Sequence, residues 1–165
     1  MNIYSVGQAA EWLAKQNESK EAVARQLRHY RKRGYVRSRG TFGSGPTATN
    51  TFGPLDLGVA KLCRALTGLG IGDEDVMQTV SEACYDLGSS DIDSGGLPGL
   101  EAALFRPDAA WSLFIFLTYH SDGSRHVYAQ VRLNNPNVRP EHPDIDAAIE
   151  LPMTAWLPNL AEMQR

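Results

Sequence analysis

The stretch LRHYRKRGYV, residues 27–36, concentrates cations and tyrosines and turns at a glycine. Val23, Leu27 and Tyr30 recur at positions i, i+4 and i+7, the spacing that places side chains on one face of an α-helix. The pattern predicts a helix over residues 20–33 with an apolar face turned toward a core. The opposite side is expected to be cationic, formed by Lys20, Ala24, Arg28 and Arg31 and flanked by Arg25 and Lys32.

A shorter helix is predicted before this one. Ser5 followed by Gln8 fits a capping box, and apolar residues at helical spacing predict a helix over residues 6–15. A tight turn follows, and Ser19 and Gly34 are placed to cap and to stop the second helix. Two short helices joined in this way are typical of a helix-turn-helix, in which the second helix enters the DNA major groove.

The distribution of charge favours a polyanionic partner. Residues 1–45 hold nine lysines and arginines and three acids, a net charge of +6, whereas the rest of the chain carries −9. A basic segment on an acidic protein indicates nucleic-acid binding rather than a merely solvated face. The two cysteines, Cys63 and Cys84, form no CxxC motif and are interpreted as buried, reduced thiols.

A β-hairpin is predicted after the cationic helix. Residues 35–36 and 50–52 are expected to be short strands around a loop rich in Gly, Ser and Thr, which is typical of the wing beside a recognition helix. Arg37 and Arg39 lie in this segment. Their side chains are expected to enter the flanking minor groove or to contact the DNA backbone.

Two further helices are predicted before a linker. One covers residues 55–67, and the acids at 73–75 begin the other at the end that its dipole makes positive. SSDIDSGG at 89–96 has the composition of a linker. The sequence therefore predicts an N-terminal domain of residues 1–88 and a C-terminal domain of residues 97–165.

Three segments in this order resemble the MerR-type winged helix-turn-helix family of bacterial regulators. They are YSVGQAAEWL at 4–13, LRHYRKRGYV at 27–36 and FGPLDLGVAKLCRALTGLGIGDEDV at 52–76. The resemblance covers residues 3–87, about half of the chain. It implies a DNA-binding domain of four helices with a β-hairpin wing, in a protein that usually acts as a homodimer on a near-palindromic site.

The resemblance also implies which residues contact DNA. Arg28 and Tyr30 match phosphate-contacting residues of the family, and His29 matches the variable aromatic position between them. The candidate contacts are base edges and nearby backbone for Ser19, Lys20 and Arg25, phosphates for Arg28, His29, Tyr30, Arg31 and Lys32, and the base of the wing for Arg37 and Arg39.

The C-terminal half is predicted to be a small α+β domain built on an antiparallel hairpin. WSLFIFLTYH and RHVYAQVRL are expected to be strands around a two-residue turn of Asp122 and Gly123, which pairs Phe116 with Ala129. The core face of this hairpin would hold Phe114, Phe116, Val127, Ala129, Val131 and Leu133. The other predicted elements are a helix at 99–105, a strand at 145–151 and a helix at 154–164, with Trp156 and Leu160 packed onto the sheet.

Three roles are open for the C-terminal domain: dimerisation, sensing of a small-molecule or protein effector, and structural support. Family members continue into a long coiled-coil helix, but no heptads follow residue 88. Homodimerisation is therefore expected to use the C-terminal domain. No catalytic, phosphate-loop, dinucleotide-binding or metal-binding motif is present, so we expect no enzyme activity, cofactor or metal.

These observations predict an α+β transcriptional regulator, bacterial or phage, that binds a specific double-stranded DNA sequence. With no signal peptide and no apolar run long enough to span a bilayer, it is expected in the cytoplasm and not in a membrane. Two alternatives remain open. One is an excisionase-like architectural protein that bends DNA, and the other is a protein-interaction module whose basic face binds an acidic partner.

Overall fold

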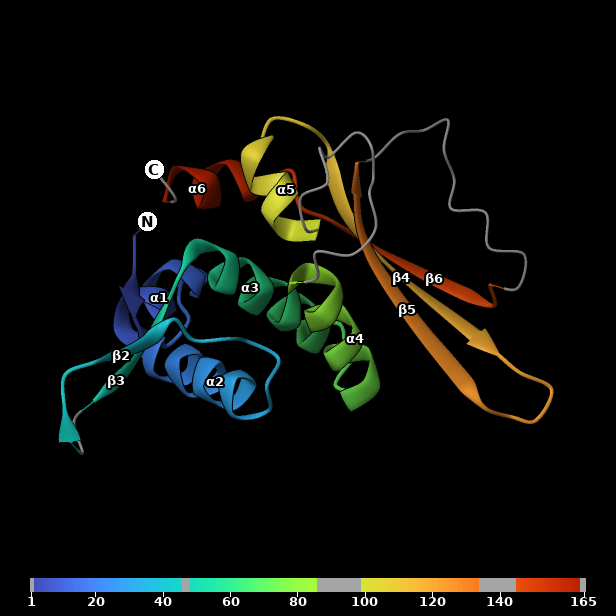
Figure 1. Ribbon diagram of the computed structural model, residues 1–165, viewed down its shortest axis with the longest axis horizontal. Helices are drawn as coiled ribbons and strands as arrows, with labels where there is room; N and C mark the ends of the chain where they lie inside the picture. Colours follow the sequence, from blue (N-terminus) through green and yellow to red (C-terminus); the bar gives the residue numbers. More distant parts are fainter. Residues whose placement is uncertain (1, 46–47, 86–98, 134–144, 164–165) are drawn as a thin grey trace. The chain divides into compact units, whose positions relative to one another are not determined.

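The computed structural model describes residues 2–45, 48–85, 99–133 and 145–163 (Figure 1). The described residues form an α+β protein with six helices and two antiparallel three-stranded sheets. None of these helices has the length and apolar character needed to cross a membrane.

The chain divides into two compact units. We call residues 1–70 with 159–165 the N-terminal unit, and residues 71–158 the sheet unit. The predicted linker at 89–96 lies outside the described residues. The fourth helix, predicted within the N-terminal domain, belongs to the sheet unit.

Three helices form most of the N-terminal unit: α1 (Val6–Leu13), α2 (Lys20–Lys32) and α3 (Pro54–Gly68). The predicted capping box is confirmed, because Gln8 accepts a hydrogen bond from the Ser5 N–H and donates its own N–H to Ser5 Oγ. Ser19 Oγ likewise accepts from the N–H of Ala22 and begins α2. Between α1 and α2 the chain turns at Asn17, whose φ of 69° lies in the left-handed region.

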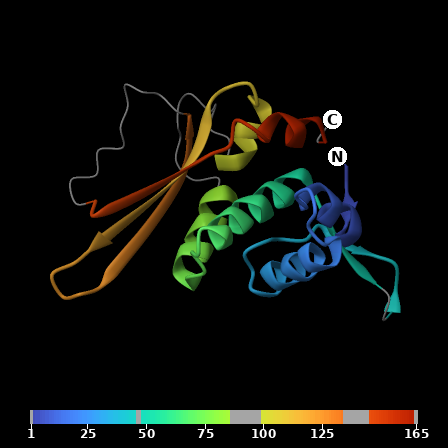
Figure 2. The same ribbon diagram turned by 180° about the vertical axis from the view of Figure 1, so that it is seen from behind.

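A small sheet flanks these helices, with strand order β1–β3–β2. Its strands are β1 (Tyr4–Ser5), β2 (Gly40–Phe42) and β3 (Thr49–Phe52). The strand predicted at 50–52 is confirmed, and the one predicted at Tyr35–Val36 is wrong. The N–H groups of those two residues both donate to the Tyr30 carbonyl, and their side chains cover the core at the end of α2. In both views the β2–β3 hairpin extends beyond α1 and α2 (Figures 1 and 2).

The sheet unit packs two helices against a second sheet, with strand order β5–β4–β6. Its elements are α4 (Glu74–Tyr85), α5 (Gly99–Phe105), β4 (Trp111–Tyr119), β5 (Arg125–Leu133) and β6 (Ala147–Pro152). The sequence predicted each of these elements. Asp73 caps α4 by accepting a hydrogen bond from the Val76 N–H, and the Arg125 guanidinium of β5 pairs with the same carboxylate at 2.8 Å.

The predicted register of the β4–β5 hairpin is wrong by one residue. Phe116 pairs with Tyr128 and not with Ala129. The His120 N–H donates to the Ser124 carbonyl, and Gly123, at φ 83°, donates its N–H to the His120 carbonyl. The loop therefore contains three residues with a left-handed glycine at its end, and the added residue shifts every pair beyond it.

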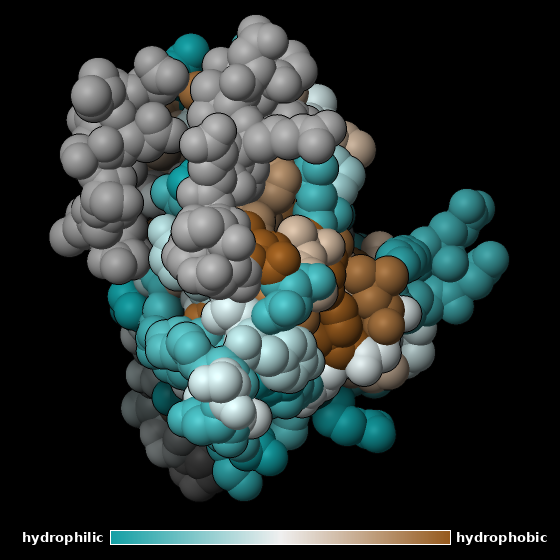
Figure 3. All heavy atoms as spheres, turned by 90° about the vertical axis from the view of Figure 1, so that its right-hand side faces the viewer, coloured by the Kyte–Doolittle hydropathy of each residue, from teal (hydrophilic) through white to brown (hydrophobic). Residues whose placement is uncertain are grey.

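The corrected register exchanges the faces of β4, whereas β5 keeps its predicted core face. The core face carries the buried side chains of Leu113, Ile115, Ala129 and Val131. The other face carries a row of stacked rings with centroids 6.1 Å apart, formed by Phe114, Phe116 and Tyr128. Figure 3 shows the molecule from the right-hand side of Figure 1. On this side, hydrophobic side chains gather in one area among hydrophilic ones.

The last helix, α6 (Leu157–Glu162), confirms a predicted helix but not its predicted packing. Leu160 was expected on the sheet, whereas residues 159–165 belong to the N-terminal unit. There the Met163 carbonyl accepts hydrogen bonds from Asn2 Nδ2 at 2.8 Å and from the Tyr4 hydroxyl at 3.1 Å. The end of α6 is thereby attached to the strand that leads into α1.

Candidate nucleic-acid interface

The outward side of α2 is cationic, but it is not the side that the sequence pattern predicted. The buried side chains of α2 are Val23, Ala24, Leu27 and Tyr30. At 100° per residue, the positions opposite them are occupied by Arg25, Arg28, His29 and Lys32, all exposed, which we call the cationic face. The predicted side was wrong because Ala24 is buried, and Lys20 and Arg31 lie toward the edge of the core. Lys20 also forms an ion pair with Glu11 of α1.

The cationic face is open to an external anion. Within the described part of the N-terminal unit, no carboxylate lies within ion-pair distance of Arg25, Arg28 or Lys32. Glu21 is the acid in the first turn of α2, and it accepts a hydrogen bond from Ser19 Oγ at 2.8 Å. Positive charge therefore dominates the middle and the end of the exposed helix surface.

Tyr30 lies in the core, as its helical spacing predicted, and not at the surface where the resemblance implied a phosphate contact. Its side chain is only 3% exposed. Its hydroxyl accepts a hydrogen bond from Gln26 Nε2 at 2.7 Å and contacts Thr67 Oγ1 at 2.8 Å. Burial raises the pKa of this phenol above its ordinary value. Tyr30 thus holds α2 against α3 and takes no direct part in the surface.

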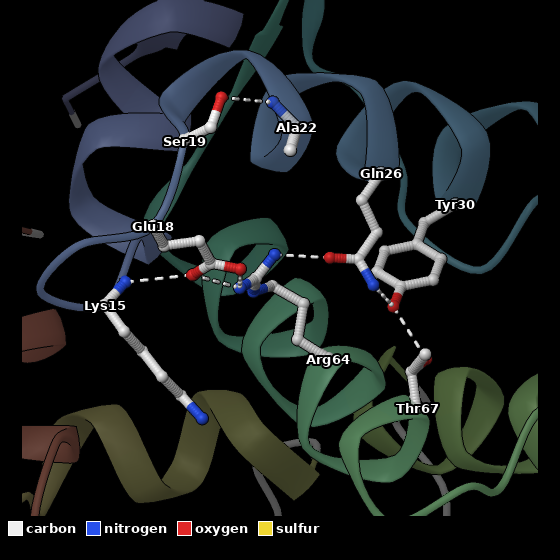
Figure 4. Close-up of polar contacts among 8 residues, drawn as sticks. All are labelled: Lys15, Glu18, Ser19, Ala22, Gln26, Tyr30, Arg64 and Thr67. Atoms are coloured by element: carbon white, nitrogen blue, oxygen red, sulfur yellow. Dashed lines mark hydrogen bonds and ion pairs between the residues drawn. The ribbon is translucent and has the colours of Figure 1, made fainter.

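Tyr30 belongs to a chain of polar contacts beneath α2 (Figure 4). Arg64 of α3 donates to both carboxylate oxygens of Glu18 at 2.7 Å and also donates to the Gln26 side chain. Gln26 then donates to the Tyr30 hydroxyl, and Thr67 Oγ1 donates to the Cys63 carbonyl at 2.9 Å. The contacts link the α1–α2 turn, the buried side of α2 and α3, and so fix the direction in which the cationic face points.

Sequence reasoning did not find this network, because its members are up to 46 residues apart. The one available signal was a charged residue, Arg64, inside the predicted third helix between the apolar positions Cys63 and Leu66. A long cation beside the apolar stripe of a helix needs a partner when it is buried. With 12% of its side chain exposed, Arg64 finds that partner in Glu18.

We expect the network to make the stability of the protein depend on acid pH. The Lys15 N–H and, next, the Arg64 guanidinium lower the pKa of Glu18 below its ordinary value of 4.5. A carboxyl whose folded-state pKa is lowered stabilises the fold above its unfolded-state pKa, and this contribution is lost as the pH falls through the folded-state value. Urea unfolding between pH 7 and pH 3 should therefore show a smaller loss of stability in Glu18→Gln than in the unaltered protein.

The variant Arg64→Met tests the same network at neutral pH. It leaves Glu18, Gln26 and their neighbours without a shared donor and is expected to lower the free energy of unfolding by about 1–3 kcal/mol. Some acid dependence should remain, because the Lys15 N–H still contacts Glu18 at 3.0 Å. Equal stability of Arg64→Met and the unaltered protein would contradict the role assigned to the network.

Arg39 has a structural partner in addition to its expected role in the wing. Its Nε lies 3.0 Å from Oδ2 of Asp56, a carboxylate with no exposed surface that also accepts the Gly53 N–H at 2.7 Å. The guanidinium is held at the base of β2, and 38% of its side chain remains exposed. Arg37 is exposed next to it.

The structure supports the interpretation of both cysteines as buried, free thiols. Burial raises the pKa of Cys63 to about 12, so its thiolate does not form near neutral pH. Across the described ranges, no three side chains of the metal-ligating types come together.

Comparison of the chain with family models, curated proteins and solved structures found no match. The class that the structure itself defines is an α+β protein with a cationic helix face and a projecting hairpin in its N-terminal unit. Both features lie within one compact unit, so their positions are fixed by that unit's own core.

Proposed function

We propose that the N-terminal unit is a winged helix-turn-helix that binds double-stranded DNA. In this proposal α1 and α2 are the helix-turn-helix, α2 enters the major groove, and the β2–β3 hairpin is the wing. The observation that carries the proposal is the cationic face of α2, which is exposed and carries three residues, Arg25, Arg28 and Lys32, that no described carboxylate of the unit neutralises.

The positions of the cationic residues along α2 suggest different DNA contacts for each. Arg25 lies nearer the start of α2, where a recognition helix approaches base edges, and its guanidinium suits the acceptors of guanine. Arg28 and Lys32 lie further along the same side and suit phosphates. The network around Arg64 supports this use, because it holds α2 by its inner side and leaves the outer side to the ligand.

We further propose that the protein is a sequence-specific transcriptional regulator that acts as a homodimer on an inverted repeat in the cytoplasm. The sheet unit is the proposed dimerisation or effector module. Its sheet supports this assignment, since β5 and β6 form the two edges of the described strands, and strand edges present backbone groups for pairing. The resemblance of the N-terminal half to MerR-type regulators points in the same direction.

The proposal is tested by fluorescence anisotropy with a pool of duplexes over a range of salt concentrations. Affinity should fall steeply with salt, because each phosphate contact releases counterions. Arg28→Ala should weaken binding to every duplex alike, whereas Arg25→Ala should change the order of preference among them. If both variants bind the pool as the unaltered protein does, α2 is not the recognition helix.

Footprinting on the duplexes that bind separates a dimeric regulator from the two alternatives. Footprints over an inverted repeat at a promoter support a dimeric regulator, whereas footprints over several direct repeats support an excisionase-like architectural role. A protein that shifts no duplex even at low salt instead points to an acidic protein partner for the cationic face.

A further inference from the structure

The β2–β3 hairpin exposes a large aromatic side chain near its tip. Phe42 is 75% exposed, more than any other large hydrophobic side chain in the described residues. All three residues of β2 are exposed. An aromatic ring in this position contributes little to the core, and it is available for contact with another molecule.

The three residues that follow Phe42 are small. Gly43 and Gly45 follow it with φ of 85° and 70°, values in the left-handed region where a side chain is strained. Ser44 stands between them, so the chain directly after Phe42 carries no bulky group. The large ring of Phe42 is thus followed by small residues, which suits entry of the ring into a groove as confined as the DNA minor groove.

A groove of about 650 Å³ is lined in part by Phe42. Gly40, which contributes no side chain, and its cross-strand partner Thr51 also line the groove. The groove is lined by both apolar and polar side chains, among them Ile3, Ser5, Gln8, Arg39, Thr41 and Phe42. It therefore suits a ligand with both apolar and polar surfaces, such as a deoxyribose-phosphate strand.

One of the residues that line the groove is a cation held in place. Arg39 lines it, and the buried carboxylate of Asp56 holds the guanidinium in place. Arg39 and the exposed ring of Phe42 lie three positions apart in sequence. This pair suits a ligand that carries anionic phosphates along its backbone and flat bases beside them. The net charge of +6 in residues 1–45 and the cationic face of α2 favour nucleic acid over an acidic protein.

We infer that Phe42 is a wedge that inserts from the minor groove between two neighbouring base pairs while the adjoining sugar-phosphate strand lies in the groove and meets Arg39. This inference rests on the proposed DNA binding and adds the minor-groove contact and its consequence for the duplex. Insertion of an apolar side chain partly unstacks a base step and kinks the helix. The protein then bends the DNA that it binds.

The test uses the full chain and a duplex of about 30 base pairs that contains flexible TA steps. Fluorescence energy transfer between dyes on its ends reports bending, anisotropy reports affinity, and 2-aminopurine placed in the duplex brightens where a base unstacks. Phe42→Ala is expected to abolish the bend and the 2-aminopurine signal and to weaken binding about tenfold. Phe42→Leu, which keeps an apolar wedge, is expected to retain most of the bend.

Leu69→Ala provides the matched control, because Leu69 is an exposed hydrophobic residue of the same unit that lies at the end of α3. It should leave affinity and bending unchanged. If the unaltered protein binds the duplex and Phe42→Ala bends and unstacks it equally, the wedge is wrong while the proposed function stands. If the unaltered protein binds no duplex at low salt, the proposed function fails, and the wedge fails with it.

Discussion

Arg28→Glu is expected to weaken binding to duplex DNA by about 100-fold at moderate salt. The substitution removes one cationic contact and places a carboxylate against the phosphates, and a charged contact of this kind is worth about 1–3 kcal/mol before repulsion is added. No described carboxylate of the N-terminal unit pairs with Arg28, so its loss should not disturb an internal ion pair. Anisotropy titrations at several salt concentrations measure both the affinity and the loss of salt dependence.

Lys15→Glu is the matched control, since it changes the net charge by the same amount within the same unit. Lys15 is exposed, and its side chain points away from α2 in Figure 4. It should cost only the small part of the affinity that comes from overall charge. Equal loss in the two variants would mean that binding depends on net charge alone, and the assignment of α2 as the recognition helix would then be untenable.

Gly99→Ala is expected to destabilise the protein by about 2–3 kcal/mol, the cost of forcing an added carbon into a closely packed site. A Cβ at this position would lie 2.5 Å from the Ala83 carbonyl oxygen of α4 and 3.5 Å from the Val131 side chain of β5. The oxygen belongs to the backbone of a helix, so it cannot move aside as the end of a flexible side chain can. Thermal unfolding followed by circular dichroism should show a transition lowered by roughly 4–12 °C.

Gly72→Ala gives the comparison for this prediction. Gly72 belongs to the same unit, and an added Cβ there would meet no atom within 4 Å. The unfolding temperature of Gly72→Ala should equal that of the unaltered protein or lie slightly above it, because alanine restricts the unfolded chain more than glycine does. An unfolding temperature for Gly99→Ala equal to that of Gly72→Ala would show that α4 and α5 do not approach as closely as described.

The sequence predicted the elements well where the signals are local. The Ser5 capping box, the Ser19 cap and the prolines and glycines that bound helices each act within one turn of chain, and the structure has helices where these signals place them. The β4–β5 hairpin and the strand near the end of the sheet unit were likewise predicted from alternating residues and a turn signal. For these elements, existence and type followed from neighbours in sequence. In the small sheet they did not, because β1 and β2 were not predicted and the strand predicted at Tyr35–Val36 is absent.

The errors arise where a single residue or a distant contact decides. One added loop residue at Ser121 reversed the face of β4 relative to β5, because side chains in a strand alternate with a period of two. Ala24 was assigned to the exposed side of α2, although a small apolar residue fits either side and its 8% exposure depends on tertiary packing. Helical spacing predicted that Tyr30 faces the core, and this is confirmed. The phosphate contact implied by the resemblance is wrong, because the Tyr30 hydroxyl lies beside Thr67, a residue 37 positions away that no local pattern links to it.

The attachment of the end of α6 to the N-terminal unit bears on how the chain folds as it is synthesised. Leu160 and Ala161 are buried and belong to the unit formed otherwise by the first seventy residues, and the Met163 carbonyl holds Asn2 and Tyr4. The ribosome therefore synthesises the first seventy residues of this unit early and its residues 159–165 much later. The N-terminal unit is therefore completed only after translation has passed through β4, β5 and β6.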